Sequence, residues 1–210
     1  MIRRTLFKNA IIVGSGAMLA SKLMAQTPPQ PEGPFYPVVD QIDKDADLIR
    51  VEGQKDIAKG EIVIVRGVVH DQNQKPIKNA KVEIWQACHS GRYDHPSDPN
   101  TSAPMDKNFQ YWGVANTNEF GEYAFRTIRP GSYPAGDGWV RPPHIHFKIA
   151  AWGYHELITQ MYFADETLNT TDLLLQKLNK KDQEKLVIRF YTQENSKHPV
   201  GHFNIEIDKI

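Results

Sequence analysis

The segment GWVRPPHIHF, residues 138–147, contains two histidines one residue apart. Because side chains alternate across a β-strand, His144 and His146 project from one face, about 7 Å apart. Ile145 and Phe147 then project from the opposite face, toward an apolar core. The two imidazoles either lie in water on a solvated strand face or line a pocket, and in a pocket they could bind a transition metal.

Two tyrosines in loop-like segments extend this set. Tyr93 lies in SGRYDH and Tyr133 in PGSYP. Taken singly, a tyrosine in a loop is most often a surface residue. Fe(III) is a hard cation that lowers the pKa of a phenol from about 10 and binds the phenolate oxygen, and imidazole also suits iron. Two phenols and two imidazoles therefore form a possible ferric iron site.

The segments that would position these residues have the pattern of short β-strands and loops. Residues 88–113 contain too many aspartates, prolines and serines for regular structure and predict a long loop. A short helix is expected within residues 171–186, with Asp172 near its start. The pattern predicts an all-β fold, a β-sandwich of about seven to eight strands with long active-site loops. The expected strands are residues 61–71, 80–86, a strand around Tyr123 and Phe125, 144–152, 156–163, 185–191 and 202–210.

Composition indicates one globular domain with extensions. The chain has 210 residues and a formal net charge of zero, which argues against nucleic-acid binding. Residues 26–60 are rich in proline and polar groups and predict an extended N-terminal arm, followed by a catalytic sandwich domain at residues 61–210. Cys88 is the single cysteine, so neither an internal disulfide nor a thiolate metal cluster is expected.

Residues 1–25 have the composition of an export signal. Arg3 and Arg4 precede an apolar run, and the small residue Ala25 follows it. The arginine pair resembles the twin-arginine type, although Ile2 stands where such signals usually carry serine or threonine. The apolar run is too short to span a bilayer comfortably. We therefore expect a periplasmic or secreted protein with no stable membrane anchor after signal cleavage.

Several segments together resemble the intradiol ring-cleaving dioxygenases, the group that contains protocatechuate 3,4-dioxygenase and catechol 1,2-dioxygenase. The matching segments run in family order over residues 32–163 and are EGPFYP, RGVVHDQNQKPIKNAKVEIWQACHSGRYDH, NTNEFGEYAFRTIRPGSYP, WVRPPHIHFKI and ELITQMYF. The resemblance implies one non-haem Fe(III) ion per chain, held by Tyr93, Tyr133, His144 and His146. It also implies that Arg141 flanks the substrate and that Gln160 lies behind the metal ligands.

The reaction that this resemblance implies inserts both atoms of O2 into a catechol-type aromatic diol. The ring opens between the two hydroxylated carbons and gives a cis,cis-muconate-type diacid. In this reading Tyr133 accepts a proton from the diol, and Arg141 stabilises negative charge that develops on the ring. A homo-oligomer is expected. The helical dimerisation extension of the catechol-cleaving relatives is missing, so the chain looks closer to a protocatechuate-type subunit.

Two alternatives explain part of the pattern. A cupin-type dioxygenase also uses a His-x-His pair but needs a carboxylate soon after it, and no acidic residue occurs between His146 and Glu156. A non-catalytic transthyretin-like binding module would explain the strands and turns but not GRY or RPPHIHF. Trp85 is expected in the core, Trp139 in the pocket wall and Tyr36 near the pocket mouth. The other histidines are interpreted as surface residues: His70, His89, His95, His155, His198 and His202.

Overall fold

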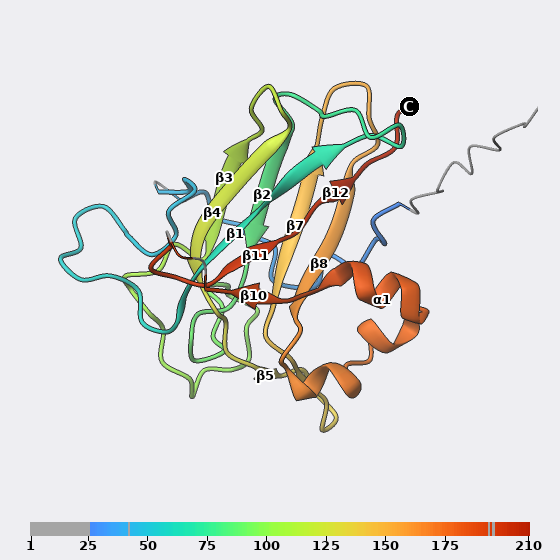
Figure 1. Ribbon diagram of the computed structural model, residues 1–210. Helices are drawn as coiled ribbons and strands as arrows, with labels where there is room; N and C mark the ends of the chain where they lie inside the picture. The colour runs from blue at the N-terminus through green and yellow to red at the C-terminus, as the bar shows by residue number, and fades with distance from the viewer. Residues whose placement is uncertain (1–25, 42, 193, 195) are drawn as a thin grey trace, which may run out of the picture.

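The computed structural model describes residues 26–41, 43–192, 194 and 196–210, so the predicted export signal lies outside the described residues. Its two main sheets face each other (Figure 1). The first sheet contains β1 (Ile62–His70), β4 (Glu122–Ile128), β10 (Phe190–Tyr191), β11 (Val200–His202) and β12 (Ile205–Glu206). The second has the order β3 (Trp112–Asn116), β2 (Lys81–Trp85), β7 (His144–Ala150), β8 (Leu157–Phe163) and β9 (Val187–Ile188).

The core lies between these sheets and explains the strand pattern. In β1, β-branched residues alternate between buried and half-buried positions, as expected for one face packed on a core. Val65 and Phe125 from the first sheet and Ile84 and Phe147 from the second belong to one buried apolar cluster. The predicted all-β sandwich is therefore confirmed.

A small hairpin and a helical segment complete the fold near one end of the second sheet (Figure 1). The hairpin pairs β5 (Tyr133–Pro134) with β6 (Val140–Arg141). The helical segment comprises η1 (Thr167–Thr170), η2 (Leu175–Lys177) and α1 (Lys180–Leu186). Among the residues described, none of the helices has the length and apolarity that crossing a bilayer requires.

The structure differs from the prediction in where this helix starts. The Asn179 side chain accepts a hydrogen bond from the Asp182 backbone amide and caps α1, so the helix begins at Lys180. Asp172 instead accepts a hydrogen bond at 2.8 Å from the amide of Leu175, the first residue of η2. β3 is a further difference, because its first two residues fall within the loop predicted over residues 88–113.

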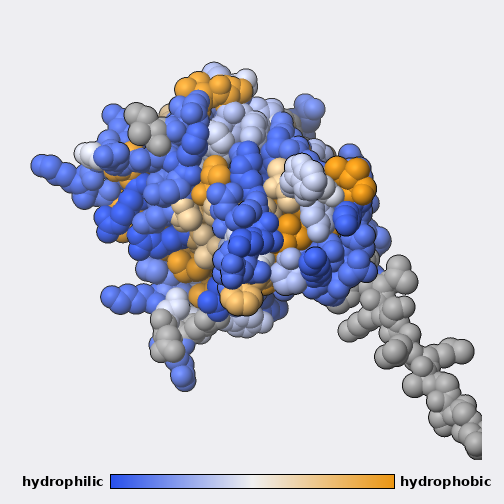
Figure 2. Space-filling model, turned by 90° about the horizontal axis from the view of Figure 1, so that it is seen from above, coloured by the Kyte–Doolittle hydropathy of each residue, from blue (hydrophilic) through white to orange (hydrophobic). Residues whose placement is uncertain are grey.

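The segment before β1 is both an arm and a part of the core. Its first described residues run beside β8, where the Gln30 amide donates to the Ile158 carbonyl at 2.9 Å. Farther along, Leu48 and Ile49 are buried in the main apolar cluster. The segment predicted as an extended arm, residues 26–60, therefore also contributes residues to the core. Figure 2 shows one outer face, on which apolar residues lie in small separate groups among hydrophilic ones.

Candidate metal centre

The histidine pair lies on β7, on the side of the second sheet that faces away from the core. His144 and His146 are each 2% exposed, while Ile145 and Phe147 are fully buried in the core on the other side. The predicted alternation is thus confirmed. The Nε2 atoms of the two histidines lie 3.2 Å apart. Both imidazoles are therefore buried side by side rather than solvated on a strand face.

Different contacts orient the two imidazole rings. His144 Nδ1 lies 2.6 Å from the Pro142 carbonyl oxygen. Because a carbonyl only accepts, Nδ1 carries the proton and the His144 Nε2 lone pair faces the pocket. His146 Nδ1 has no hydrogen-bond partner among the described residues, and its ring stacks on Trp85 at 4.8 Å and 11°. Packing rather than hydrogen bonding therefore sets the direction of His146.

Tyr93 and Tyr133 come from separate segments that two glycines allow to touch. Gly91 has a φ of +78°, and a Cβ there would lie 2.2 Å from the Ser132 carbonyl oxygen. At Gly131 a Cβ would lie 2.4 Å from the Gly91 amide nitrogen. Only residues without a side chain permit this approach. The two tyrosine rings consequently lie 5.3 Å apart and perpendicular to each other.

The tyrosines meet the histidines at the pocket. The ring of Tyr133 lies 5.7 Å from that of His144, and the ring of Tyr93 lies 6.4 Å from that of His146. Both tyrosines are buried, and the Tyr93 hydroxyl has no hydrogen-bond partner of normal geometry among the described residues. The structure therefore brings together all four residues that the family resemblance implies as metal ligands.

The electrostatics of the four residues reflect burial next to a cation. Burial raises the pKa of Tyr93 well above its ordinary value, and the neighbouring Tyr133 adds to this effect. Burial also raises the pKa of Tyr133, while Arg141 opposes the increase. Burial and then Arg141 hold the pKa values of His144 and His146 well below 6.5. Without a metal, the set therefore consists of neutral phenols and neutral imidazoles.

Arg141 is the centre of a buried polar network beside the histidines. Its Nε donates to Asp172 Oδ2 at 3.1 Å, and its Nη2 donates to Gln160 Oε1 at 2.9 Å and to the Tyr162 hydroxyl at 3.1 Å. Its Nη1 lies 3.1 Å from His144 Nε2. Arg141 is 4% exposed, and Asp172 and Gln160 are fully buried. The network fixes the guanidinium next to the candidate metal ligands.

The chemistry of the four residues fits a ferric ion. The Nε2 atoms of His144 and His146, 3.2 Å apart, suit adjacent positions around one ion. Two metal–nitrogen bonds of roughly 2.0–2.1 Å place their nitrogens about this far apart when the angle between the bonds is a right angle or somewhat wider. No cluster of three or more His, Cys, Asp or Glu side chains occurs in the part of the chain that the structure describes. Any metal at this pocket therefore needs the phenol oxygens as well, and phenolate is a hard ligand.

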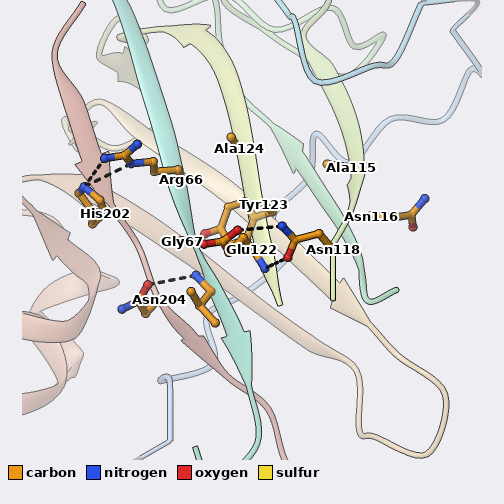
Figure 3. A pocket seen from close by; sticks show the side chains of 11 residues that line it. Arg66, Gly67, Ala115, Asn116, Asn118, Glu122, Tyr123, Ala124, His202 and Asn204 are labelled. Atoms are coloured by element: carbon orange, nitrogen blue, oxygen red, sulfur yellow. Dashed lines mark hydrogen bonds between the residues drawn. The ribbon is translucent and has the colours of Figure 1, made fainter. Parts of the chain in front are cut away.

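A cavity of about 460 Å³ opens onto this site. Its lining includes Tyr133, Arg141 and His146, together with the predicted wall residue Trp139. A larger cavity of about 640 Å³ is lined by residues of β1, β3, β4 and β11 and by Asn118 and Asn204 (Figure 3). It contains none of the four candidate ligands, and Figure 3 shows its polar side chains bonded mainly to each other. The smaller cavity is the candidate active site because the buried ionisable groups gather there.

Two predictions about surrounding residues are wrong. Tyr36 does not line the cavity: it packs edge-on against Trp85 at 5.0 Å, and its hydroxyl donates to the buried Glu83 at 3.1 Å. Next to this carboxylate, burial raises the pKa of Tyr36 to about 12. His70 is not a surface residue either, because it is buried with Nδ1 at 3.0 Å from the Asp71 carbonyl oxygen.

Three further residues, which were not predicted from the sequence, complete the site. Asp172 pairs with Arg141 although 31 positions separate them. Tyr162 lies opposite His144 in the β7–β8 register. Phe35, from the arm, lies 4.6 Å from the Tyr93 ring and lines the cavity. A fully buried aspartate in a polar segment has no local sequence signal, whereas Tyr162 could have been found from its position two residues after Gln160.

Comparison with known proteins agrees with this geometry. A family model described as dioxygenase matches residues 31–208. The chain is 36% identical over 174 residues to the protocatechuate 3,4-dioxygenase beta chain of Burkholderia cepacia, covering 80% of this chain and 73% of that one. It is 31% identical over 169 residues to catechol 1,2-dioxygenase of Candida albicans, covering 74% of this chain but only 52% of that enzyme.

Solved structures give the same result. An intradiol ring-cleavage dioxygenase from Tetranychus urticae is 27% identical with a TM-score of 0.64, and the match covers 88% of this chain and 95% of that one. The dioxygenase domain of a carbohydrate-binding fusion protein from Streptomyces sp. SirexAA-E is 28% identical with a TM-score of 0.65, covering 89% and 100%. The chain belongs to the dioxygenase family, and its homologues are intradiol ring-cleaving dioxygenases.

Proposed function

We propose that this protein is a non-haem Fe(III) intradiol dioxygenase that cleaves a catechol-type diol with O2 to a cis,cis-muconate-type diacid. The observation that carries the proposal is the convergence of two buried phenols and two buried imidazoles beside a cavity that Tyr133 and His146 line. Tyr93, Tyr133, His144 and His146 would hold the ion. When bound, Fe(III) supplies Lewis acidity and draws electron density from the chelated diol.

The residues around the ion have separate roles in this proposal. Tyr133 accepts a proton from the incoming diol at its phenolic oxygen. This transfer requires the diol to bind within hydrogen-bond reach of Tyr133, and Tyr133 lines the cavity. Arg141 faces the same cavity and stabilises negative charge on the ring with a permanent cation. Gln160 keeps Arg141 in place by accepting from Nη2 and by donating to the Pro31 carbonyl at 2.8 Å.

The transthyretin-like binding module is the weaker alternative. Such a module needs a sandwich and a ligand pocket but no arrangement of phenols around imidazoles. Burying four ionisable side chains together is costly unless something binds them. Iron content distinguishes the two functions directly, because the enzyme requires one Fe(III) per chain and the module requires none.

The test is spectroscopic and kinetic. Phenolate-to-iron charge transfer should give the purified full chain a burgundy colour with a mid-visible band, and O2 uptake should begin on addition of a catechol. Tyr133→Phe should shift this band and slow turnover while the far-ultraviolet circular dichroism stays unchanged. A colourless protein without iron after expression in iron-replete medium would refute the proposal. An unchanged spectrum in Tyr133→Phe would refute the assignment of that tyrosine.

Export and assembly are two further parts of the proposal. The arginine pair Arg3–Arg4 before an apolar run supports twin-arginine export to the periplasm or beyond. Replacing both arginines by lysine should leave the protein in the cytoplasmic fraction. We also propose a homo-oligomer, which light scattering of the purified protein tests. A monomer, or retention of export in the Lys–Lys variant, would count against these assignments.

A further inference from the structure

The cavity beside the candidate metal centre has one charged side chain in its lining. Among the described residues that form this lining, only Arg141 carries a permanent charge. The other lining residues are apolar or carry no permanent charge; the apolar part of the wall consists of Pro34, Phe35, Pro99, Pro134, Ala135, Trp139 and Leu174. The part of a substrate ring that points away from the metal therefore meets an apolar wall.

Arg141 does not supply a free positive charge for a ring substituent. Asp172 is fully buried and accepts from Nε at 3.1 Å and from Nη2 at 3.4 Å, which balances the guanidinium charge. Gln160 and Tyr162 also accept from Nη2. The remaining donor, Nη1, lies 3.1 Å from His144 Nε2 and so points toward the metal ligands. Arg141 is placed to act on the diol end of a substrate rather than on its substituent.

No second basic side chain joins Arg141 in the described lining of the cavity. Arg92 is near the Tyr93 loop, but it faces Asp98 at 3.4 Å and is not part of the lining. Asp137 is exposed and follows the lining residue Gly136 in the hairpin turn. A carboxylate on the substrate ring would thus lose water in this cavity without gaining a cationic partner, which is strongly unfavourable.

We infer that this enzyme takes catechols whose ring substituents are uncharged and apolar, and that it discriminates against carboxylated catechols. The wall residues Leu174 and Ala135 then act as specificity determinants. The inference rests on the proposed function, since it presupposes that a catechol binds at this cavity. It separates this chain from its relative from Burkholderia cepacia, whose name gives protocatechuate, a carboxylated catechol, as the substrate.

The test compares two ligands of nearly equal size that differ in charge. 3,4-Dihydroxybenzoate and 3,4-dihydroxybenzamide are titrated anaerobically into the ferric protein, with the change in the visible band as the readout. Catechol and 4-methylcatechol serve as positive controls for binding and for O2 uptake. We expect the carboxylate to bind at least about tenfold more weakly than the amide, because its charge finds no partner.

Variants of the wall control for differences in acidity and metal affinity between the two diols, because these differences are the same in every variant. Leu174→Lys should change the ratio of carboxylate to amide affinity by about tenfold in favour of the carboxylate, since the new ammonium would pair with it. Leu174→Met is the matched control and should leave the ratio unchanged. Ala135 is an exposed residue of the lining, so Ala135→Lys places a cation at a second position. A folding defect in one of the two lysine variants then does not decide the outcome.

The possible results separate this inference from the proposed function. Wild-type protein that binds or cleaves the carboxylate as well as the amide overturns the inference while the proposed function stands. Lysine variants that fold but leave the ratio unchanged overturn the assignment of Leu174 and Ala135. If catechol and 4-methylcatechol neither shift the visible band nor cause O2 uptake, the proposed function fails, and the inference fails with it.

Discussion

The Arg141–Asp172 pair gives the sharpest stability prediction. The two groups are 4% and 0% exposed, so Asp172→Asn leaves a buried cation without its counter-charge. Removing one partner of a buried pair typically costs about 3–5 kcal/mol. The lower end, about 3 kcal/mol, applies here because Gln160 and Tyr162 still accept from Arg141. The asparagine oxygen can still accept from the Leu175 amide, so the loss reports the contact with Arg141 rather than this hydrogen bond.

Equilibrium urea unfolding measures this loss. The titration is run with excess chelator, so that metal binding does not contribute to the free energy of unfolding. With a slope of about 2–3 kcal/mol per molar urea, a loss of about 3 kcal/mol lowers the midpoint by about 1–1.5 M. The control is Glu119→Gln, because Glu119 pairs with Lys78 at 2.8 Å but the two side chains are 75% and 56% exposed. This exposed pair should contribute no more than about 0.5 kcal/mol.

A second variant tests whether the cost comes from the unpaired charge. Adding Arg141→Met to Asp172→Asn removes the buried cation and should restore part of the lost stability. Equal midpoints for Asp172→Asn and Glu119→Gln would refute the reasoning. If the stability loss of the double variant equals the sum of the losses of Asp172→Asn and Arg141→Met, the two groups do not interact, and the reasoning is refuted as well.

Two further predictions concern the contacts of the arm with the site. A Cβ at Gly33, where φ is +77°, would lie 3.3 Å from His146 Cε1, whereas Gly53 has φ +79° and no atom within 4 Å. Backbone strain should lower the free energy of unfolding of both glycine-to-alanine variants by about 1–2 kcal/mol. Only Gly33→Ala should also lose iron faster to a chelator. Equal rates of iron loss in the two variants would contradict the contact with His146. Tyr36→Phe removes a hydrogen bond to the buried Glu83 and should cost about 1–3 kcal/mol in urea unfolding, so an unchanged midpoint would show that this bond contributes nothing.

The main strands and the chemistry of β7 could be predicted because both depend on local alternation. His144 and His146 had to share a face once the segment was a strand, and the two neighbouring apolar residues had to form the core. The prediction that Tyr93 and Tyr133 lie beside the two histidines came from the family resemblance. No local pattern shows that Gly91 and Gly131 let the two loops touch, because the reason is the absence of Cβ atoms at a contact between distant segments.

The remaining differences involve long-range contacts. Residues 185–191 have the pattern of one strand, yet β9 pairs with β8 in the second sheet and β10 pairs with β11 in the first. The chain thus passes from one sheet to the other within a single apolar run, and local periodicity carries no sign of this change. Leu48 enters the core from a segment without any period, so only the three-dimensional structure identifies it as a core residue.

The covering of the second sheet explains why a His-x-His pair is buried here rather than solvated. In β2, Val82 and Ile84 face the core, yet Glu83 and Trp85 on the opposite face are each only 1% exposed. The arm causes this burial, because it runs along β8 and places its aromatic residues over that face. The strands therefore fix the position of His146, while the arm removes water from it. A site built between a rigid sheet and an arm can keep its metal ligands in place while the arm and loops define which ring substituent fits.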